Sequence, residues 1–130
     1  MTCGKKPSVL VVENHDEVRD LIANLVAAQG WVPISVSGVR EAIERLKTDK
    51  IDAIISDWEL DDGEGNTVLA AARSEGRKIP VIIVSSYATE ELRQQACQAG
   101  AIALLEKPFR IEKLTEILCR EFSEVSPTNA

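Results

Sequence analysis

The sequence alternates between short apolar runs and segments whose apolar residues recur at helical spacing. This alternation is the feature that most restricts its fold. Five short runs are continuously apolar and rich in β-branched residues. Runs of this kind are typical of strands buried on both faces of a parallel sheet. The predicted strands are Val9–Val12, Ile34–Val36, Ile51–Ile55, Val81–Val84 and the weaker Ala101–Leu105.

Apolar residues at helical spacing lie between and after these runs. We expect Asp16 to cap the first helix, and Gly30, Gly76 and Gly100 to mark helix ends. The apolar residues at this spacing form five stripes, each on one face of a predicted helix. The fourth stripe consists mostly of small residues, which predicts a helix held to the sheet by few apolar contacts. The stripes are Val18, Leu21, Ile22, Leu25 and Val26; Val39, Ala42, Ile43 and Leu46; Val68, Leu69 and Ala72; Leu92, Ala96 and Ala99; and Ile111, Leu114, Leu118 and Phe122.

Five strand–helix units in alternation predict an α/β fold with a doubly wound, five-stranded parallel sheet. The 130 residues suit one domain with its own core. We therefore expect a single domain over residues 1–130, with a core from about residue 8 to about residue 123 and loose termini. Nothing in the pattern indicates a repeat or a second domain.

Composition excludes several functional classes. The formal net charge of -6 argues against direct nucleic-acid binding by this chain. Three scattered cysteines and one histidine do not make a zinc site or a disulfide framework. The sequence shows no signal peptide and no run long enough to span a membrane, so we expect a cytoplasmic protein without a membrane partner.

Polar residues follow the predicted strands at the points where each strand ends. In open α/β sheets, ligands bind beyond the carboxyl ends of the strands. The residues at these ends should therefore converge on one rim of the sheet. They are Glu13 and Asn14 after the first strand, Asp57 after the third, Ser85 after the fourth and Lys107 after the fifth.

These residue types suit phosphoryl transfer to a carboxylate. Asp57 can attack phosphorus and form an acyl phosphate. The transferred group is strongly negative, so the site needs a cation and hydrogen-bond donors. Oxygens of Glu13, Asn14 and Asp57 suit Mg²⁺. Ser85 and Lys107 are placed to contact the phosphoryl oxygens.

Four segments in this order resemble the landmarks of the response-regulator receiver domain, the phosphoacceptor module of two-component signalling. The resemblance extends from about Val9 to about Phe122 and is closest to chemotaxis-regulator-like receivers. It implies the flavodoxin-like (βα)5 receiver fold. The segments are V-L-V-V-E-N-H-D-E-V-R, I-I-S-D-W-E-L, P-V-I-I-V-S-S and L-L-E-K-P-F.

The resemblance also implies a role for each site residue. Asp57 matches the phosphorylated aspartate, and Ser85 and Lys107 match the hydroxyl and the lysine that respond to phosphorylation. Mg²⁺ would be bound by Glu13, Asn14, Asp57 and the backbone carbonyl of Glu59. Glu59 and Tyr87 occupy positions that tune dephosphorylation.

The implied partners are a sensor histidine kinase or a phosphotransfer protein, together with an unidentified output partner or domain. Phosphorylation would change the face formed by the fourth helix, fifth strand and fifth helix, and this face offers a route to a homodimer. Such a protein catalyses only its own phosphorylation and dephosphorylation, so it is not an enzyme for a foreign substrate.

The chain departs from the family pattern at four positions. Glu13 stands where an aspartate is usual and is one methylene longer, so it could reach the metal directly and offset part of a loss in affinity. Asn14 replaces the second acid of the usual pair, and one charge fewer at ~4 Å from the metal costs about 1 kcal/mol in water or about 4 kcal/mol at an effective dielectric constant of about 20. We therefore expect weaker Mg²⁺ binding than is usual. Leu104 stands where the family carries an aromatic residue, and Asp61 replaces a proline.

Simpler interpretations apply to several of these residues. Ser85 is also placed to cap the following helix. We expect His15 to be a plain surface residue and Trp58 to be partly exposed beside the site. The acids of the loop, Asp61, Asp62 and Glu64, are expected to be solvated.

Three other functions fit part of the pattern. A pseudo-receiver that docks partners independently of phosphate would suit Asn14 and Leu104. A haloacid-dehalogenase-type phosphohydrolase also uses a nucleophilic aspartate, but Asp57 follows the third strand and the chain leaves no room for a cap domain. A flavodoxin-like FMN binder needs a phosphate loop after the first strand, where Glu13 and its acidic neighbours would repel phosphate.

Overall fold

The computed structural model describes residues 6–125, and a parallel sheet covered by helices on both faces organises them. Residues 1–5 and 126–130, which include most of the expected loose ends, lie outside the described residues. The sheet order is β2-β1-β3-β6-β7, with every pair parallel. Its strands are β1 (Ser8–Val12), β2 (Val32–Val36), β3 (Ala53–Asp57), β6 (Val81–Ser85) and β7 (Ala103–Glu106).

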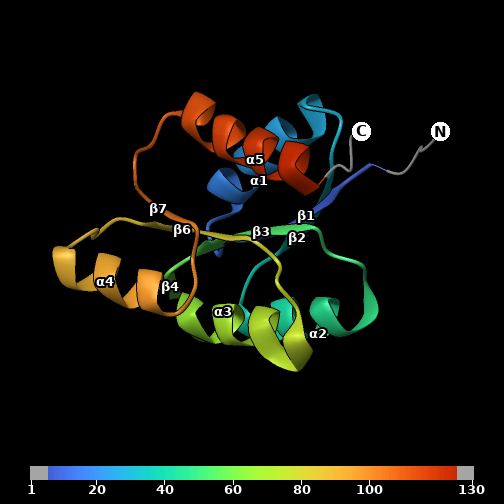
Figure 1. Cartoon of the computed structure of the whole chain (residues 1–130). Coiled ribbons are helices and arrows are strands. Elements are labelled where there is room, and N and C mark those ends of the chain that lie inside the picture. Colours follow the sequence, from blue (N-terminus) through green and yellow to red (C-terminus); the bar gives the residue numbers. More distant parts are fainter. Residues whose placement is uncertain (1–5, 126–130) are drawn as a thin grey trace.

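The helices form two layers, one on each face of the sheet (Figure 1). Helices α1 and α5 cover one face, while α2, α3 and α4 cover the other. This arrangement confirms the predicted doubly wound, flavodoxin-like fold. The bounds are α1 (Asp16–Ala28), α2 (Val39–Thr48), α3 (Gly65–Arg73), α4 (Glu90–Gln98) and α5 (Ile111–Val125).

Alternate residues of the central strands build two separate cores. Val9 and Val11 of β1 pack toward α1 and α5, whereas Leu10 and Val12 pack toward the other three helices. All four side chains are at most 1% exposed. A strand buried on both faces needs apolar residues at every position, which explains the continuous run in the sequence.

The outer strands depart from the predicted burial. The sequence pattern predicted that β2 and β7 would be buried on both faces, but their residues are mostly half-buried or exposed. Both strands lie at an edge of the sheet, where only one neighbouring strand covers them. That prediction was therefore wrong for the two edges and right for β1, β3 and β6.

A short hairpin and a 3-10 turn lie between β3 and β6, on either side of α3. A two-stranded antiparallel hairpin, β4 (Glu59–Leu60) with β5 (Gly63–Glu64), leads into α3. A 3-10 turn, Ser74–Gly76, ends that helix near the predicted Gly76. The three predicted helix-end glycines all adopt positive φ, at 89° for Gly30, 76° for Gly76 and 103° for Gly100.

Helix starts differ from the expected capping. Asp16 is the first residue of α1 rather than its cap, because His15 holds the capping position without a side-chain hydrogen bond. The Asp16 carboxylate instead accepts a hydrogen bond from Arg19, at 2.6 Å. Thr89 caps α4 by accepting a hydrogen bond from the backbone N–H of Leu92.

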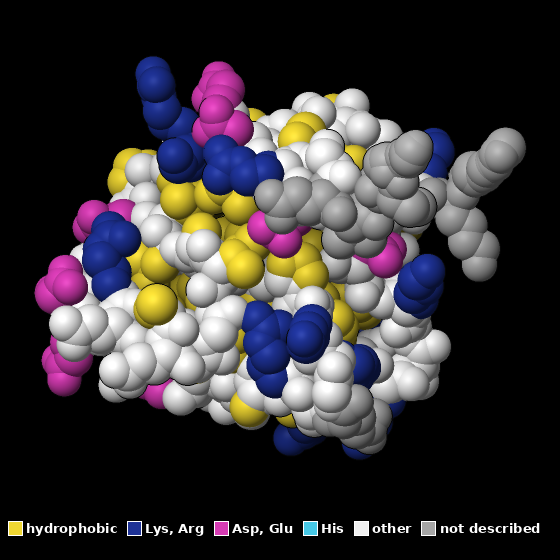
Figure 2. Space-filling view, viewed as in Figure 1, with side chains coloured by type: hydrophobic (Ala, Val, Ile, Leu, Met, Phe, Trp, Pro, Cys, Tyr) yellow, Lys and Arg dark blue, Asp and Glu magenta, His cyan; other side chains and the backbone are white. Residues whose placement is uncertain are grey.

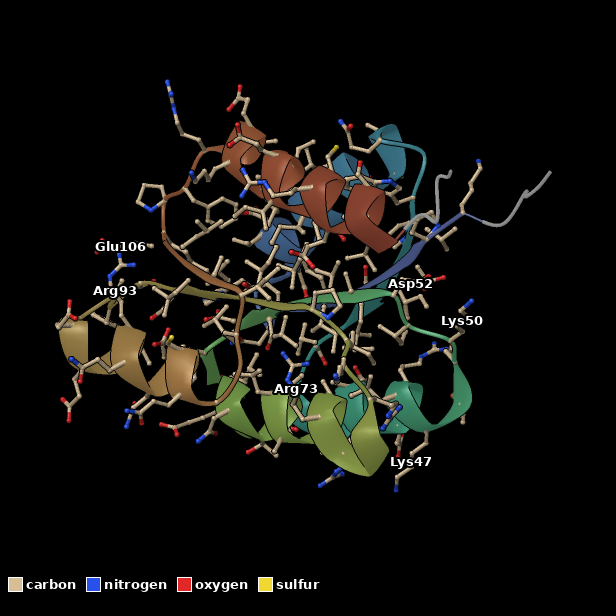
Figure 3. The ribbon with its side chains drawn as sticks, in the orientation of Figure 1. Lys47, Lys50, Asp52, Arg73, Arg93 and Glu106 are labelled. Atoms are coloured by element: carbon tan, nitrogen blue, oxygen red, sulfur yellow. The ribbon has the colours of Figure 1, made fainter. Side chains whose placement is uncertain are left out.

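Arg73 connects the last turn of α3 to two loops of the sheet (Figure 3). Its guanidinium donates to the backbone carbonyl of Ile79 at 2.5 Å and to that of Gly100. Ile79 precedes β6, and Gly100 lies between α4 and β7. One side chain thus links three segments that are distant in sequence.

Candidate functional site

Three of the predicted site residues meet in one ion-paired cluster at the carboxyl end of the sheet. The Lys107 ammonium lies 2.7 Å from Oδ2 of Asp57 and 2.9 Å from Oε1 of Glu13. The side chains of Glu13 and Asp57 are 1% and 2% exposed, and that of Lys107 is 17% exposed. One lysine therefore neutralises part of the charge of two buried carboxylates.

The parallel strands bring these residues together. Asp57 is the last residue of β3, and Glu13 directly follows β1, where its N–H donates to Val36 of β2. Lys107 directly follows β7, and its N–H donates to the carbonyl of Ser85 at 2.8 Å. The shared rim expected from the sequence is therefore present.

Gly65 allows α3 to begin directly against this rim. A Cβ atom at Gly65 would lie 2.8 Å from the carbonyl oxygen of Asp57 and 3.1 Å from Cα of Trp58. The N–H of Gly65 also donates to the carbonyl of Trp58 at 2.8 Å. A residue with a side chain would push the helix away from the backbone that carries Asp57.

Burial and charge shift the pKa values of the three residues in different directions. Burial is the main cause that raises the pKa of Asp57 to about 6; the Glu13 carboxylate adds to the rise, and Lys107 opposes it. Burial also acts to raise the pKa of Glu13, but hydrogen bonds from Lys107 and His15 outweigh it, so this pKa is lowered. Burial acts to lower the pKa of Lys107, but its two carboxylate partners raise it overall.

Asn14 is oriented by the acidic loop after β3. Its Nδ2 donates to Oδ1 of Asp61 at 3.2 Å. Its own Oδ1 is buried and has no hydrogen-bond partner among the described residues. A buried oxygen without a donor carries an unfavourable free energy unless a cation or water meets it.

Ser85 ends β6, but its hydroxyl is bonded away from the Lys107 cluster. It donates to Oε2 of Glu59 at 2.6 Å and accepts from the N–H of Tyr87 at 3.0 Å. The alternative interpretation of Ser85 as a helix cap is wrong, because Thr89 caps α4.

Glu59 and Tyr87, the two predicted tuning residues, flank this hydroxyl. The Glu59 N–H donates to Oδ1 of Asp57 at 3.2 Å, so both oxygens of Asp57 have partners. The Tyr87 side chain is 71% exposed. The backbone carbonyl of Glu59 as a metal ligand stays a prediction.

Three contacts of His15, Asp61 and Asp62 at or near the site were not predicted from the sequence. His15, interpreted as a plain surface residue, contacts Oε2 of Glu13 through its ring Nδ1, at 3.0 Å. Asp61 positions Asn14, and Asp62 accepts from the N–H groups of Val39 and Arg40 at the start of α2. The position of His15 two residues past Glu13 was the available signal.

The burial of Trp58 differs from the expectation. We expected it to be partly exposed, but it is 6% exposed and belongs to the core cluster under α2, α3 and α4. Leu104, at the position where the family carries an aromatic residue, packs against the same cluster. Both side chains therefore contribute to packing beneath the site.

The charged groups present fit a divalent cation. Ligating atoms of Glu13, His15 and Asp57 all lie within 4.8 Å of one another. The carboxylates are hard oxygen donors, and the unpartnered Oδ1 of Asn14 offers another oxygen. The donor set is thus suitable for Mg²⁺ or a similar ion.

An apolar groove of about 370 Å³ adjoins the site on the side of α1. Its walls come from α1 and from the segment around the Lys107–Pro108 peptide, which is cis. Leu21 on its rim is 54% exposed. The groove therefore lies beside the lysine that holds Asp57.

The sequence matches a family model, the response regulator receiver domain, over residues 9–119. The chain belongs to this receiver family. Receiver domains are signalling modules of two-component systems, so the predicted resemblance is confirmed. The placement of Asp57, Glu13 and Lys107 at one rim gives this membership a physical basis.

Named relatives of this receiver domain are longer proteins. An NtrX-like response regulator of Rickettsia bellii is 31% identical over 114 residues, covering 86% of this chain and 24% of that protein. The phosphate regulon transcriptional regulatory protein PhoB of Escherichia coli is 26% identical over 121 residues, covering 92% of this chain and 53% of PhoB. The chain thus spans about a quarter to a half of these relatives.

A solved structure shows the same fold with a metal ion. The receiver domain of the sensor histidine kinase PA1611 from Pseudomonas aeruginosa is 26% identical, with a TM-score of 0.80 over 92% of this chain and 99% of that one. That structure holds a magnesium ion in its active site cleft. Within residues 6–125 of the present receiver domain, no helix is long and apolar enough to cross a membrane.

Proposed function

We propose that this receiver domain is a phosphorylation-controlled switch and that Asp57 accepts the phosphoryl group. A carboxylate oxygen of Asp57 forms a bond to phosphorus while the phosphorus–nitrogen bond of a partner's phosphohistidine breaks. The electron pair of that bond returns to the imidazole nitrogen. The partner is a sensor histidine kinase or a phosphotransfer protein.

The observation that carries this proposal is the buried contact between Asp57 and Lys107, 2.7 Å long, at the end of the central strand β3. A buried carboxylate with raised pKa is typical of functional sites rather than of structural surface residues. Because Lys107 is bonded to Asp57, in our proposal its ammonium contacts the oxygens of the incoming phosphoryl group.

A divalent cation would supply charge neutralisation for the incoming phosphoryl group. In our proposal Glu13, Asn14, Asp57 and the backbone carbonyl of Glu59 hold it. Asn14 carries no charge, so the site binds Mg²⁺ more weakly than an acidic pair would. Water later hydrolyses the acyl phosphate, and Glu59 and Tyr87 tune that step.

Phosphorylation would change the contacts of Ser85. The acyl phosphate adds about two negative charges beside a buried hydroxyl. Ser85 would then exchange its bond with Glu59 for one with the phosphoryl group, which repositions the loop from β6 to α4. The output is a change on the face formed by α4, β7 and α5.

The α4–β7–α5 face suits an output partner or a second copy of the chain. Figure 2 shows hydrophobic side chains gathered in the middle of the view, with charged side chains around them. Ile102, just before β7, is 40% exposed. In our proposal this face engages a protein partner and not a nucleic acid.

Binding of beryllofluoride, a phosphoryl mimic, tests the proposal. We expect saturable, Mg²⁺-dependent binding, read by tryptophan fluorescence, and a phosphoryl mass added by acetyl phosphate in the wild type. Asp57→Asn should lose both signals. Absence of both signals in the wild type at tens of millimolar Mg²⁺ would contradict the switch.

A second candidate is a pseudo-receiver that binds partners without phosphate. The bonds of Lys107 to both carboxylates favour it, because they neutralise part of the carboxylate charge without a metal. In that case Asp57→Asn would leave partner binding unchanged, and beryllofluoride would not bind.

A further inference from the structure

The imidazole of His15 lies at the acidic site, on the opposite oxygen of Glu13 from Lys107. Ring Nδ1 of His15 is 3.0 Å from Oε2 of Glu13, whereas the Lys107 ammonium is 2.9 Å from Oε1. The backbone N–H of His15 also donates to Oε2, at 3.1 Å. This second bond fixes the loop so that the imidazole stays next to the carboxylate.

The distances between these donor atoms match the spacing of metal ligands. Donor atoms of Glu13, His15 and Asp57 all lie within 4.8 Å of one another. An octahedral ion with bonds of about 2.1 Å places neighbouring ligands about 3 Å apart. The 3.0 Å between His15 and Glu13 is therefore both a hydrogen-bond distance and a distance between two ligands of one ion.

Asn14, which lies between Glu13 and His15 in the sequence, carries a buried oxygen, Oδ1, that lacks a hydrogen-bond partner within residues 6–125. Its Nδ2 is held by Asp61. The amide is thus fixed with its oxygen free to accept a cation. His15 follows Asn14 directly, and its side chain is 69% exposed, so an ion can approach from solvent.

The donor set favours a softer ion than Mg²⁺. The Asn14 amide offers an oxygen without a negative charge, and a hard cation gains most from charged oxygen ligands. Adding an imidazole strengthens binding of first-row transition ions, for which nitrogen is a preferred donor. Asn14 and His15 therefore shift the preference in the same direction.

We propose that His15 is a nitrogen ligand for a first-row divalent cation of the Co²⁺ or Zn²⁺ class, bound with Glu13 and Asp57 in preference to Mg²⁺. This inference deepens the proposed function, on whose metal site it rests. In this inference the imidazole of His15 binds the ion directly and so determines which ion the site prefers. The simpler interpretation is that His15 only forms a surface hydrogen bond with Glu13.

Isothermal titration of Mg²⁺ and Co²⁺ at fixed pH tests the inference. The protein must carry no histidine tag, because His15 is the chain's one histidine. Cys3, Cys97 and Cys119 are changed to serine in every variant, since thiols also bind these ions. We expect Co²⁺ to bind at least about tenfold more tightly than Mg²⁺.

The decisive comparison is His15→Gln against the matched control Glu17→Gln. His15→Gln should weaken Co²⁺ binding about tenfold or more while changing Mg²⁺ binding less than about threefold. Glu17→Gln, at a neighbouring exposed acid, should change neither. Equal Co²⁺ affinity in the wild type and His15→Gln would overturn the inference.

Nuclear magnetic resonance of the imidazole separates ligation from mere proximity. Zn²⁺ should shift the ¹⁵N resonance of one ring nitrogen of His15, and unchanged ring resonances at saturating Zn²⁺ would refute ligation. Beryllofluoride binding with Mg²⁺ is measured on the same samples. Its survival alongside a negative His15 result would refute only the inference, whereas its absence alongside His15-dependent Co²⁺ binding would refute only the proposed switch.

Discussion

At the scale of single residues, Asp57 shows how burial and charge prepare a carboxylate. Its oxygens accept from Lys107 and from the N–H of Glu59, yet burial still raises its pKa to about 6. The charged form that a nucleophile needs is therefore less favourable in the folded protein than in the unfolded chain, although it predominates above about pH 6. Lys107 limits this effect but does not remove it.

This raised pKa predicts the pH dependence of stability. A carboxyl group whose pKa is higher in the folded state than its usual 3.8 favours folding at low pH, and this contribution is lost as the pH rises through about 6. Asp57→Asn should therefore stabilise the protein at pH 7.5, by about 1–2 kcal/mol in the free energy of unfolding. Urea denaturation at pH 7.5 and pH 5 measures the difference.

The gain from Asp57→Asn should shrink at pH 5, where the wild-type carboxyl is largely protonated. Lys107 keeps its Glu13 partner in the variant, so its ammonium is not left unpaired. A variant that is less stable than the wild type at pH 7.5 would show that the Lys107–Asp57 contact outweighs the effect of burial.

Asn14 offers a second prediction at this scale. Asn14→Asp restores a charge at the metal site and should tighten Mg²⁺ binding about tenfold, between the limits of about 1 and about 4 kcal/mol for one charge. Mg²⁺ titration by calorimetry measures the change. The new carboxylate would also face Asp61, which now accepts from Asn14.

The double variant Asn14→Asp/Asp61→Asn controls for that repulsion. It keeps the added metal ligand and removes the facing charge. Its gain in Mg²⁺ affinity should therefore be of the same order as that of Asn14→Asp, and its loss of folding stability should be smaller. Unchanged Mg²⁺ affinity in both variants would mean that residue 14 does not bind the metal.

At the scale of elements, the hairpin β4–β5 stabilises a helix distant from it in sequence. Asp62 accepts from the N–H groups of Val39 at 2.8 Å and Arg40 at 3.1 Å. These hydrogen bonds hold the pKa of Asp62 below its usual value. The carboxylate performs the role of a cap for α2, whose own capping residue is Gly38.

Asp62→Ala should destabilise the protein by about 1 kcal/mol, the usual effect of losing a helix cap. Glu64→Ala, at an exposed acid of the same hairpin, is the matched control and should change stability little. Chemical denaturation of both variants makes the comparison. Equal effects of the two substitutions would show that general loop charge, and not capping, is responsible.

At the scale of the whole molecule, α4 is held to the sheet by few buried residues. Only Leu92 and Ala96 of its nine residues are buried, and Thr89 caps its start. Helix α3, by contrast, buries four residues, among them Val68 and Leu69. The weakly anchored helix α4 therefore follows the loop after Ser85, which phosphorylation is proposed to move.

Hydrogen exchange should show this difference directly. We expect the amides of α4 to exchange at least about tenfold faster than those of α3, because local opening of α4 exposes less apolar surface. Beryllofluoride with Mg²⁺ should then slow exchange in α4 and β7 more than in α3. Mass spectrometry of peptides reads both effects, and Asp57→Asn is the control that should show no change with beryllofluoride. Equal exchange in α3 and α4 would contradict the predicted weak anchoring.

Local sequence rules were enough to predict the fold and the rim that carries the candidate site. Continuous apolar runs such as Val81–Val84 have only one suitable place, a strand covered on both faces. Polar residues at the ends of such strands must then share one rim. Strand and helix identities, the rim, and the residues Glu13, Asp57, Ser85 and Lys107 followed from these local rules.

The partner that each side chain takes could not be predicted from these rules, because it depends on how the elements pack together. The edge position of β2, the burial of Trp58 and the contact of His15 with Glu13 all depend on neighbours distant in sequence or on the path of a loop. The same holds for the Ser85 hydroxyl, which bonds to Glu59. Periodicity reports which face of an element is buried, whereas hydrogen-bond partners and pKa values depend on distances that arise only when the elements pack together.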